Sequence, residues 1–225
     1  MSSLFTLLTL NMQCSLNGTR HEQLLQLVDI IKSNKIICVC LQDLNLTSLS
    51  ILKSKLHKYS LIEALTNGTP QVIIYSNECK MEEEFCYDLP SEENREVIGC
   101  KLVFKEKEYE ILNVWLEKEQ SKFREKQVEV LLEVASPKTI IVGDFNIFQP
   151  NEASNSLLLQ SKLCDAWITS GCNPLLRNTT FYEGEWYRTV RLLYLKNSYS
   201  ITCNGLFNND CDNSMVSYDV VTALQ

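Results

Sequence analysis

The sequence predicts a mixed α/β fold in which strand–helix–strand units are combined with β-hairpins. Three observations support this prediction: apolar runs of strand length, amphipathic segments with helical spacing, and turn residues between neighbouring strands. The chain of 225 residues suits one large α/β domain, and no repeat, low-complexity tract or linker divides it. We therefore expect a single domain over residues 1–225 with helices outside a mixed sheet system.

The N-terminal part of the chain alternates apolar strands with amphipathic helices. The expected elements are strands at 4–13, 35–44, 59–65 and 71–77, and helices at 19–35 and 48–59. The turn residues "TNGTP" separate the third of these strands from the fourth. The acidic segment 81–97 that follows is expected to be a solvated loop.

The remaining chain contains more strands and fewer helices. The expected elements are strands at 98–104, 109–116, 138–148, 180–186, 189–197, 200–207 and 217–225, and helices at 119–135 and 151–163. The charged stretch "KEKE" joins the first two strands, so we expect a hairpin there. The resulting order favours mixed sheets over a purely parallel one.

Composition limits the class of partner and the compartment. The net charge of −7 favours a protein partner over bare nucleic acid, because Lys and Arg contacts to phosphate drive nucleic-acid binding. Ten cysteines occur without a CxxC pair, and Cys38 and Cys40 alternate along one face of an apolar run. We expect them to be buried thiols in a reducing compartment. No signal peptide or membrane span is expected, which favours an intracellular protein, cytoplasmic or nuclear, without a membrane partner.

The segment "TIIVGDFNIF", Thr139 to Phe148, is the clearest candidate for a functional site. An apolar strand ends in Gly-Asp-Phe-Asn, which places Asp144 and Asn146 at its tip. An Asp and an Asn in such a place either serve chemistry or close a turn through backbone hydrogen bonds.

Seven blocks in chain order resemble the endonuclease/exonuclease/phosphatase superfamily, the DNase I-like metal-dependent phosphodiesterases. They are "TLNMQ", "CLQD", "LNVWLE", "IIVGDFN", "LCDAW", "RLLYLKN" and "SYDVVTAL". The stretch "WLEKEQSKFREKQVEVLLE" is most similar to the tyrosyl-DNA phosphodiesterase 2 branch. The resemblance implies a four-layer α/β sandwich of two packed mixed sheets, with the active site at the strand tips.

The resemblance also implies roles for four residues. Asn11 would contact the metal-bound water or the phosphate, although an amide there can also cap a strand end. Asp144 and Asn146 would orient the attacking water and bind phosphate. Asp43 stands where the family has a metal-binding Glu, with an arm one methylene shorter. No cofactor is certain, but a remnant site would hold Mg²⁺ or Mn²⁺, hard cations that prefer oxygen ligands.

The positions of the family's catalytic His and Asp residues are altered. They are occupied by Trp115, Leu193, Tyr218 and Asp219. In an alternative alignment that matches this block to "RTVRL", the family's Asp position falls on Val190 instead of Leu193, and Val190 is also apolar. A bulge in the last strand would let Asp219 serve as the missing Asp, but "VVTAL" aligns without such a slip.

The chain contains two histidines, His21 and His57, and both fall in predicted helices away from these blocks. Because each lost proton-transfer group costs on the order of 10² to 10⁴ in rate, little phosphodiesterase activity is expected to remain. The sequence therefore favours a pseudoenzyme that acts by binding or regulation, with a protein as the favoured partner. The alternatives are a divergent Mg²⁺- or Mn²⁺-dependent phosphodiesterase or nuclease, acting on nucleic acid or another phosphate ester, and a subunit of a larger assembly.

Overall fold

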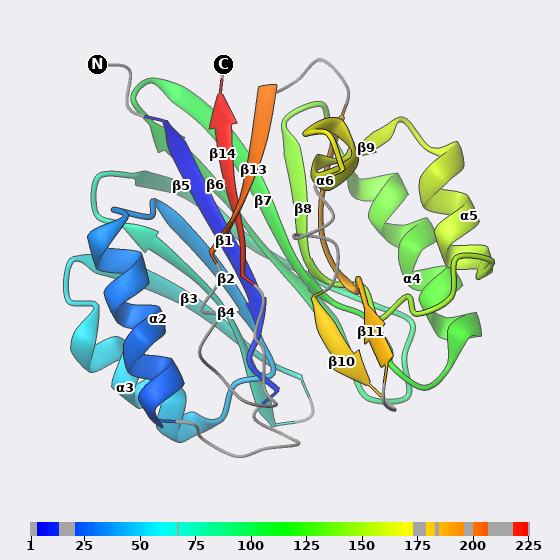
Figure 1. Ribbon diagram of the computed structural model, residues 1–225, viewed down its shortest axis with the longest axis horizontal. Coiled ribbons are helices and arrows are strands. Elements are labelled where there is room, and N and C mark those ends of the chain that lie inside the picture. The colour runs from blue at the N-terminus through cyan, green and yellow to red at the C-terminus, as the bar shows by residue number, and fades with distance from the viewer. Residues whose placement is uncertain are drawn as a thin grey trace.

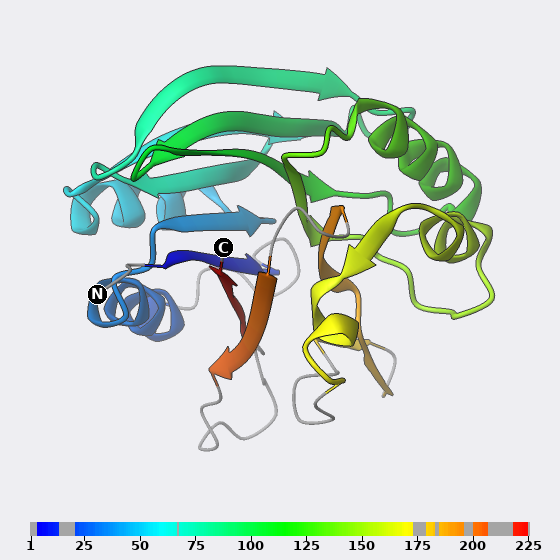
Figure 2. The ribbon, with the colours of Figure 1, turned by 90° about the horizontal axis from the view of Figure 1, so that it is seen from above.

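Two six-stranded mixed sheets face each other, and helices cover the outer face of each sheet (Figure 1). The computed structural model describes residues 4–13, 21–66, 68–172, 179–182, 185–195, 200–206 and 218–224. Figure 2 shows α2 (His21–Ser33) and α4 (Ser121–Val134) on opposite sides of the paired sheets. The order helix, sheet, sheet, helix confirms the predicted four-layer sandwich.

The first sheet has the strand order β13-β14-β1-β2-β4-β3. Its strands are β1 (Phe5–Asn11), β2 (Cys38–Gln42), β3 (Tyr59–Thr66), β4 (Thr69–Ser76), β13 (Ser200–Leu206) and β14 (Tyr218–Leu224). Only β1 and β2 pair in parallel among them, so their C-terminal ends lie at the same edge of the sheet. Outside the sheet, α2 is joined by α3 (Leu46–Lys55), whose first turn is capped by the side chain of Asn45.

The second sheet has the strand order β5-β6-β7-β8-β12-β9. Its strands are β5 (Lys80–Asp88), β6 (Glu96–Phe104), β7 (Lys107–Trp115), β8 (Thr139–Asp144), β9 (Leu163–Asp165) and β12 (Val190–Leu195). The parallel pair is β7–β8, and it brings two strand ends together as β1–β2 does in the first sheet. Helices α4 and α5 (Ala153–Gln160) cover this sheet, and α6 (Ala166–Thr169) and the hairpin β10 (Thr180–Tyr182) and β11 (Glu185–Tyr187) complete the described elements.

Three apolar layers follow from the alternation of side chains along each strand. Leu8 and Leu10 of β1 pack with α2 and α3, whereas Phe5 and Leu7 face the second sheet. Likewise Ile140 and Val142 of β8 face the first sheet, and Ile141 packs beneath α4 and α5. β1 and β8 are thus apolar on both faces, which explains the continuous apolar runs at these positions in the sequence.

The acidic segment that we predicted to be a loop, residues 81–97, lies in part in the edge strand β5, so that prediction was wrong from Met81 to Asp88. The backbone of β5 pairs antiparallel with β6, while most of its side chains are exposed. Charged side chains on an edge strand hinder pairing with another chain. Backbone pairing with a neighbour outweighed the polar local composition here.

Helices α2, α4 and α5 lie within the predicted ranges, α3 begins two residues before its predicted start, and the short α6 was not predicted. His21 is the first residue of α2, but His57 lies beyond the end of α3, so its predicted helical position was wrong. No helix in the described part of the chain is both long enough and apolar enough to cross a membrane.

The buried cysteines are expected to resist thiol reagents. Cys38, Cys40 and Cys100 lie in the apolar layer between the sheets, and burial raises the pKa of the Cys100 thiol. The pKa of Cys79 is raised to about 12, chiefly by burial, so its thiolate is scarce at neutral pH. A maleimide should label exposed Cys172 within minutes but these four only after unfolding, as peptide mass spectrometry would show. Equal labelling of Cys100 and Cys172 in the native protein would contradict this expectation.

Candidate functional site

A row of three residues crosses the second sheet where β7 and β8 end. Trp115 of β7 lies beside Asp144 of β8 in the parallel register, and Val190 of β12 lies opposite Asp144 on its other side. All three alternate in phase with Ile140 and Val142, so they occupy the face turned toward the first sheet. Asp144 is therefore buried between an aromatic and an aliphatic neighbour.

Asp144 is held by two amide donors. Its Oδ2 accepts a hydrogen bond from Nδ2 of Asn11 at 2.6 Å, across the gap between the sheets. Its Oδ1 accepts one from the backbone N–H of Asn146 at 3.0 Å. The amide of Asn11 is itself oriented, because its Oδ1 accepts from the backbone N–H of Gln13 at 2.9 Å. The structure thus brings together three of the residues that the sequence singled out.

The residues beyond the strand tips adopt backbone conformations that are uncommon for non-glycine residues. Asp43 has φ of 51° and Asn146 has φ of 49°, in the left-handed region that Asp and Asn tolerate best. The Nδ2 of Asn146 donates to the carbonyl of Leu116 at 2.8 Å, which secures the turn after β8. Asp43 is buried and follows Gln42, the β2 residue in register with Asn11. Asp43 therefore lies at the same strand-end edge as the Asn11–Asp144 pair.

Arg95 is a site residue that the sequence analysis missed. Its guanidinium carbon lies 3.9 Å from the centre of the Trp115 ring, and the residue is only 5% exposed. Nη2 donates to Glu93 at 2.5 Å, but Nε and Nη1 have no partner. A buried arginine with two unused donors is costly unless a ligand completes its hydrogen bonds. The only sequence signal was a lone Arg in an acidic segment.

Val190, and not Leu193, is the β12 residue beside Asp144. Leu193 pairs with Ile141 and packs in the apolar layer beneath α4 and α5, on the other face of the sheet. The register therefore places Val190, the residue that the shifted alignment offered, beside Asp144. Either alignment leaves an apolar side chain where the resemblance implies an acid.

The last strand pairs without an irregularity beside the site. The β1–β14 register runs continuously from Phe5 opposite Ala223 to Thr9 opposite Asp219, so no bulge shifts Asp219 over this range. Tyr218 begins β14, and the side chains of both residues fall outside the described part of the structure. Of the chain's two histidines, His21 is the first residue of α2, which packs on the outer face of the first sheet, and His57 follows α3. Neither belongs to the strands β1, β2, β7 and β8 whose ends form the site.

A polar layer lies between the sheets behind the site. Asn113 of β7 accepts from Nε2 of Gln42 at 2.7 Å and donates to the carbonyls of Leu41 and Val72 at 3.2 and 2.8 Å. Gln71 donates to the carbonyl of Asn113 at 2.6 Å. These bonds join β2, β4 and β7 and hold the two strand-end edges at a set separation.

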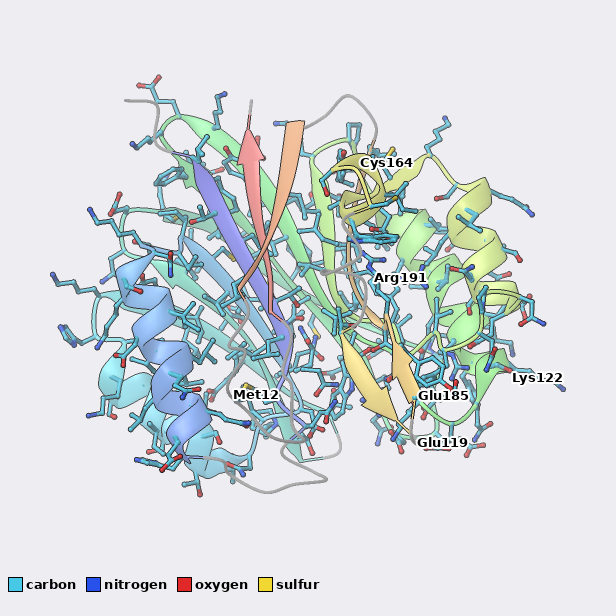
Figure 3. The ribbon with its side chains drawn as sticks, viewed as in Figure 1. Met12, Glu119, Lys122, Cys164, Glu185 and Arg191 are labelled. Carbon is cyan, nitrogen blue, oxygen red and sulfur yellow. The ribbon has the colours of Figure 1, made fainter. Side chains whose placement is uncertain are left out.

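The acid of the "LCDAW" block has a structural role. Asp165 accepts two hydrogen bonds from Arg188, both at 2.6 Å, and its side chain also caps α6. Nearby, burial lowers the pKa of the Arg191 guanidinium, and Asp165 opposes this effect. Figure 3 labels Arg191 between β12 and α5, where it donates to Asn155 at 2.9 Å.

The described side chains do not form a metal centre of the usual kind. Among residues whose side chains the structure describes, no group of three or more His, Cys, Asp or Glu converges on one point. Both oxygens of Asp144 already accept hydrogen bonds, which leaves fewer lone pairs for a hard cation. The described acids nearest the strand tips, Asp43 and Asp144, thus do not belong to a cluster of three, and we derive no chemical step through a metal.

Comparison with solved structures identifies the fold. The chain superposes on TDP2 from D. rerio with a TM-score of 0.82 at 20% identity, covering 98% of both chains. An endonuclease/exonuclease/phosphatase from Bacteroides vulgatus gives 0.82 at 12% identity over 99% of both chains. A mannosyl-6-phosphatase from Bacteroides thetaiotaomicron gives 0.75 at 16% identity, covering 99% of this chain and 100% of that one. No family model and no curated protein matches the sequence.

The chain therefore has the DNase I-like fold of endonuclease/exonuclease/phosphatase proteins. The predicted resemblance, including its TDP2-like character, is confirmed at the level of the fold.

Proposed function

We propose that this protein binds a phosphate ester at the strand-end site and has lost the hydrolytic activity associated with its fold. The observation that carries the proposal is the surrounding of Asp144. Its two oxygens are occupied by Asn11 and Asn146, and its neighbours in the sheet are Trp115 and Val190. None of these neighbours transfers a proton, whereas phosphodiester hydrolysis needs an activated water and a protonated leaving group.

Arg95 supplies the binding chemistry in this proposal. Its Nε–H and Nη1–H have no partner, and each can donate a charge-assisted hydrogen bond to a phosphate oxygen. The stacked Trp115 ring holds the guanidinium plane in place. Two amide-bearing residues, Asn11 and Asn146, line the same edge, so the site is polar enough to accept an anion beside the Asp144 carboxylate.

The proteins of similar fold support phosphate esters as the ligand class. TDP2 from D. rerio is described in a complex with a single-strand DNA product, and one Bacteroides relative is described as a mannosyl-6-phosphatase. Both descriptions involve phosphate esters. The surface charge of −7 still favours a protein as an additional partner.

The first experiment separates binding from turnover. Purified protein would be assayed with Mg²⁺ and with Mn²⁺ against a generic phosphodiester, a 5′-tyrosyl oligonucleotide, and single- and double-stranded DNA and RNA, alongside Asp144→Asn. We expect no turnover that depends on Asp144. Metal-dependent hydrolysis that disappears in Asp144→Asn would overturn the loss of activity.

Replacing Arg95 with alanine is expected to weaken binding of a 5′-phosphorylated oligonucleotide by roughly tenfold to a hundredfold, since charge-assisted hydrogen bonds contribute about 1.5–3 kcal/mol. Fluorescence anisotropy would measure the change. Arg95→Lys keeps the charge but not the planar donors and should recover only part of it. Lys105→Ala, an exposed lysine in the β6–β7 turn, serves as the control. Unchanged affinity in a folded Arg95→Ala protein would remove Arg95 from the site.

A divergent metal-dependent phosphodiesterase or nuclease is the second candidate. One observation favours it: Asn11, Asp144 and Asn146 are all present and connected by hydrogen bonds. In that case Asp43 and Asp219 would be the next acids to replace. The turnover assay with Asp144→Asn decides between the two candidates.

A further inference from the structure

A basic pocket lies at the end of the sandwich away from the candidate site. It has a volume of about 730 Å³, within the range of small-molecule sites. Four lysines from two stretches of the chain line it: Lys32, Lys35, Lys55 and Lys58. They come from the end of α2, the α2–β2 loop, the end of α3 and the α3–β3 loop.

The strand directions place this pocket and the site at opposite ends. Ile37, in the pocket lining, immediately precedes β2, and Gln42 ends β2 beside Asn11. The five steps between Ile37 and Gln42 extend about 17 Å. In Figure 1 the chain passes from the upper end of α2 into β2 and runs down toward the site, and Figure 3 labels Met12 at that lower end.

The positive charge of the pocket is not neutralised within the described structure. None of its four lysines belongs to an ion pair there, and the single acid in the lining is Glu78. Since the chain carries a net charge of −7, such a concentration of unpaired cations contrasts with the rest of the molecule. Like charges gathered around one cavity repel each other, and a bound polyanion relieves that repulsion.

Stabilisation of helix ends does not account for the whole cluster. Lys32 and Lys55 lie in the last turns of α2 and α3, where a cation complements the helix dipole. Lys35 and Lys58 lie beyond the helices. Lys35 is the residue after the C-terminal cap of α2 and has φ of 51°. Its backbone N–H donates to the carbonyl of Lys32, and the backbone N–H of Ile36 donates to the carbonyl of Ile31. Glycine is usual at the position of Lys35, and a side chain in this conformation costs about 1 kcal/mol.

The uncharged part of the pocket suits a ring-bearing ligand. Ile37 and Leu56 are buried beneath it and Tyr59 is half-buried, which gives the pocket an apolar and aromatic wall. Burial, and secondarily Glu78, raises the pKa of Tyr59, so its phenol stays neutral at physiological pH. His57 and Asn77 add groups that bind hydroxyl and ring nitrogen atoms.

We propose that this pocket binds a nucleoside polyphosphate, with the phosphates on the four lysines and the base or ribose against Tyr59 and Glu78. Several phosphate charges close together match several ammonium groups better than one carboxylate or one phosphate does. An apolar wall beside the cations provides for the remainder of such a ligand. This site is separate from the strand-end site and does not depend on the function proposed there.

Isothermal titration calorimetry with ATP, inorganic tripolyphosphate and adenosine, each without added metal, tests this proposal. We expect ATP to bind most tightly, tripolyphosphate more weakly, and adenosine at least tenfold more weakly than ATP, with ATP affinity falling as salt rises. Equal affinity for ATP and tripolyphosphate would overturn the assignment of a nucleoside to this pocket. Adenosine binding as tightly as ATP, or no binding of either phosphate, would overturn it.

Matched charge reversals assign any binding to the pocket. The double substitution Lys35→Glu and Lys58→Glu should weaken ATP binding at least tenfold, since each lost contact is a charge-assisted one. Replacing two exposed lysines elsewhere, Lys122→Glu and Lys126→Glu in α4, makes the same change in net charge and should alter affinity less than twofold. Equal effects of the two pairs would show non-specific attraction and overturn the assignment. The Lys35→Glu and Lys58→Glu pair should weaken ATP binding by the same factor in an Arg95→Ala background, which separates this result from the strand-end site.

Discussion

Replacing Gly143 with alanine is expected to destabilise the protein by about 4 kcal/mol or more. Gly143 has φ of +140°, a conformation open almost only to glycine, and an added Cβ would lie 2.0 Å from the carbonyl oxygen of Val114. That oxygen belongs to the neighbouring strand β7, so it cannot move without disturbing the sheet. Strain and clash together should cost about 4 kcal/mol or more, against a typical total stability of about 5–15 kcal/mol.

Urea denaturation followed by tryptophan fluorescence would measure this loss of stability. Gly171→Ala is the matched control, because Gly171 also has a positive φ of +101° but nothing lies within 4 Å of an added Cβ. Its cost should be about 1–2 kcal/mol, from conformation alone. If the two substitutions cost the same, the close approach of β7 and β8 would not be the reason for glycine. That approach also sets Trp115 beside Asp144, so the glycine of "GDFN" supports the site geometry.

Replacing Arg124 with methionine is expected to destabilise the protein by about 4 kcal/mol, because it leaves a buried carboxylate without its cation. Arg124 of α4 donates through Nε and Nη2 to Glu152 at 3.0 and 2.6 Å, and both side chains are nearly buried. Its Nη1 donates to the carbonyls of Glu117 and Lys118 at 3.1 and 2.6 Å. One side chain therefore ties α4 to the β7–α4 loop and to the segment after "GDFN".

A double-mutant cycle would test this role. Combining Arg124→Met with Glu152→Gln removes the unpaired charge and should restore part of the lost stability. The exposed Lys122 lies in the same helix and points outward (Figure 3), so Lys122→Met should change stability by less than about 0.5 kcal/mol. If Arg124→Met cost no more than Lys122→Met, the pair would have no structural importance. Urea titrations would give the free energy of unfolding of the parent protein, Arg124→Met, Glu152→Gln and the double variant.

Local sequence pattern was sufficient to locate most of the strands and helices. The apolar runs and helical spacings located the strands and helices, because each side chain's burial depends on its own position in a strand or helix. The longest exception was β5, an edge strand whose exposed acidic side chains look like loop residues, and the short β9 and α6 were also not predicted. The strand conformation of β5 depends on hydrogen bonds to β6, a partner that composition does not reveal.

The site was only partly predictable. Asp144 and Asn146 were found because "GDFN" is contiguous, and Asn11 because it ends the first strand. Arg95 was missed, since its position over Trp115 depends on how the loop before β6 reaches the end of β7. The choice between Leu193 and Val190 needed the β8–β12 register, because a shift changes which face a residue occupies.

The sequence by itself determined the order of strands and helices, the resemblance to the DNase I-like fold, and the absence of any histidine from the blocks that form the site. Only the tertiary structure decided which side chains surround Asp144 and which lysines form the basic pocket. Arg95 over Trp115, Val190 beside Asp144, and the four lysines of the basic pocket each join residues distant in the chain. Such contacts depend on strand register and on where loops return, and these are set by pairing between remote segments and not by local residue pattern.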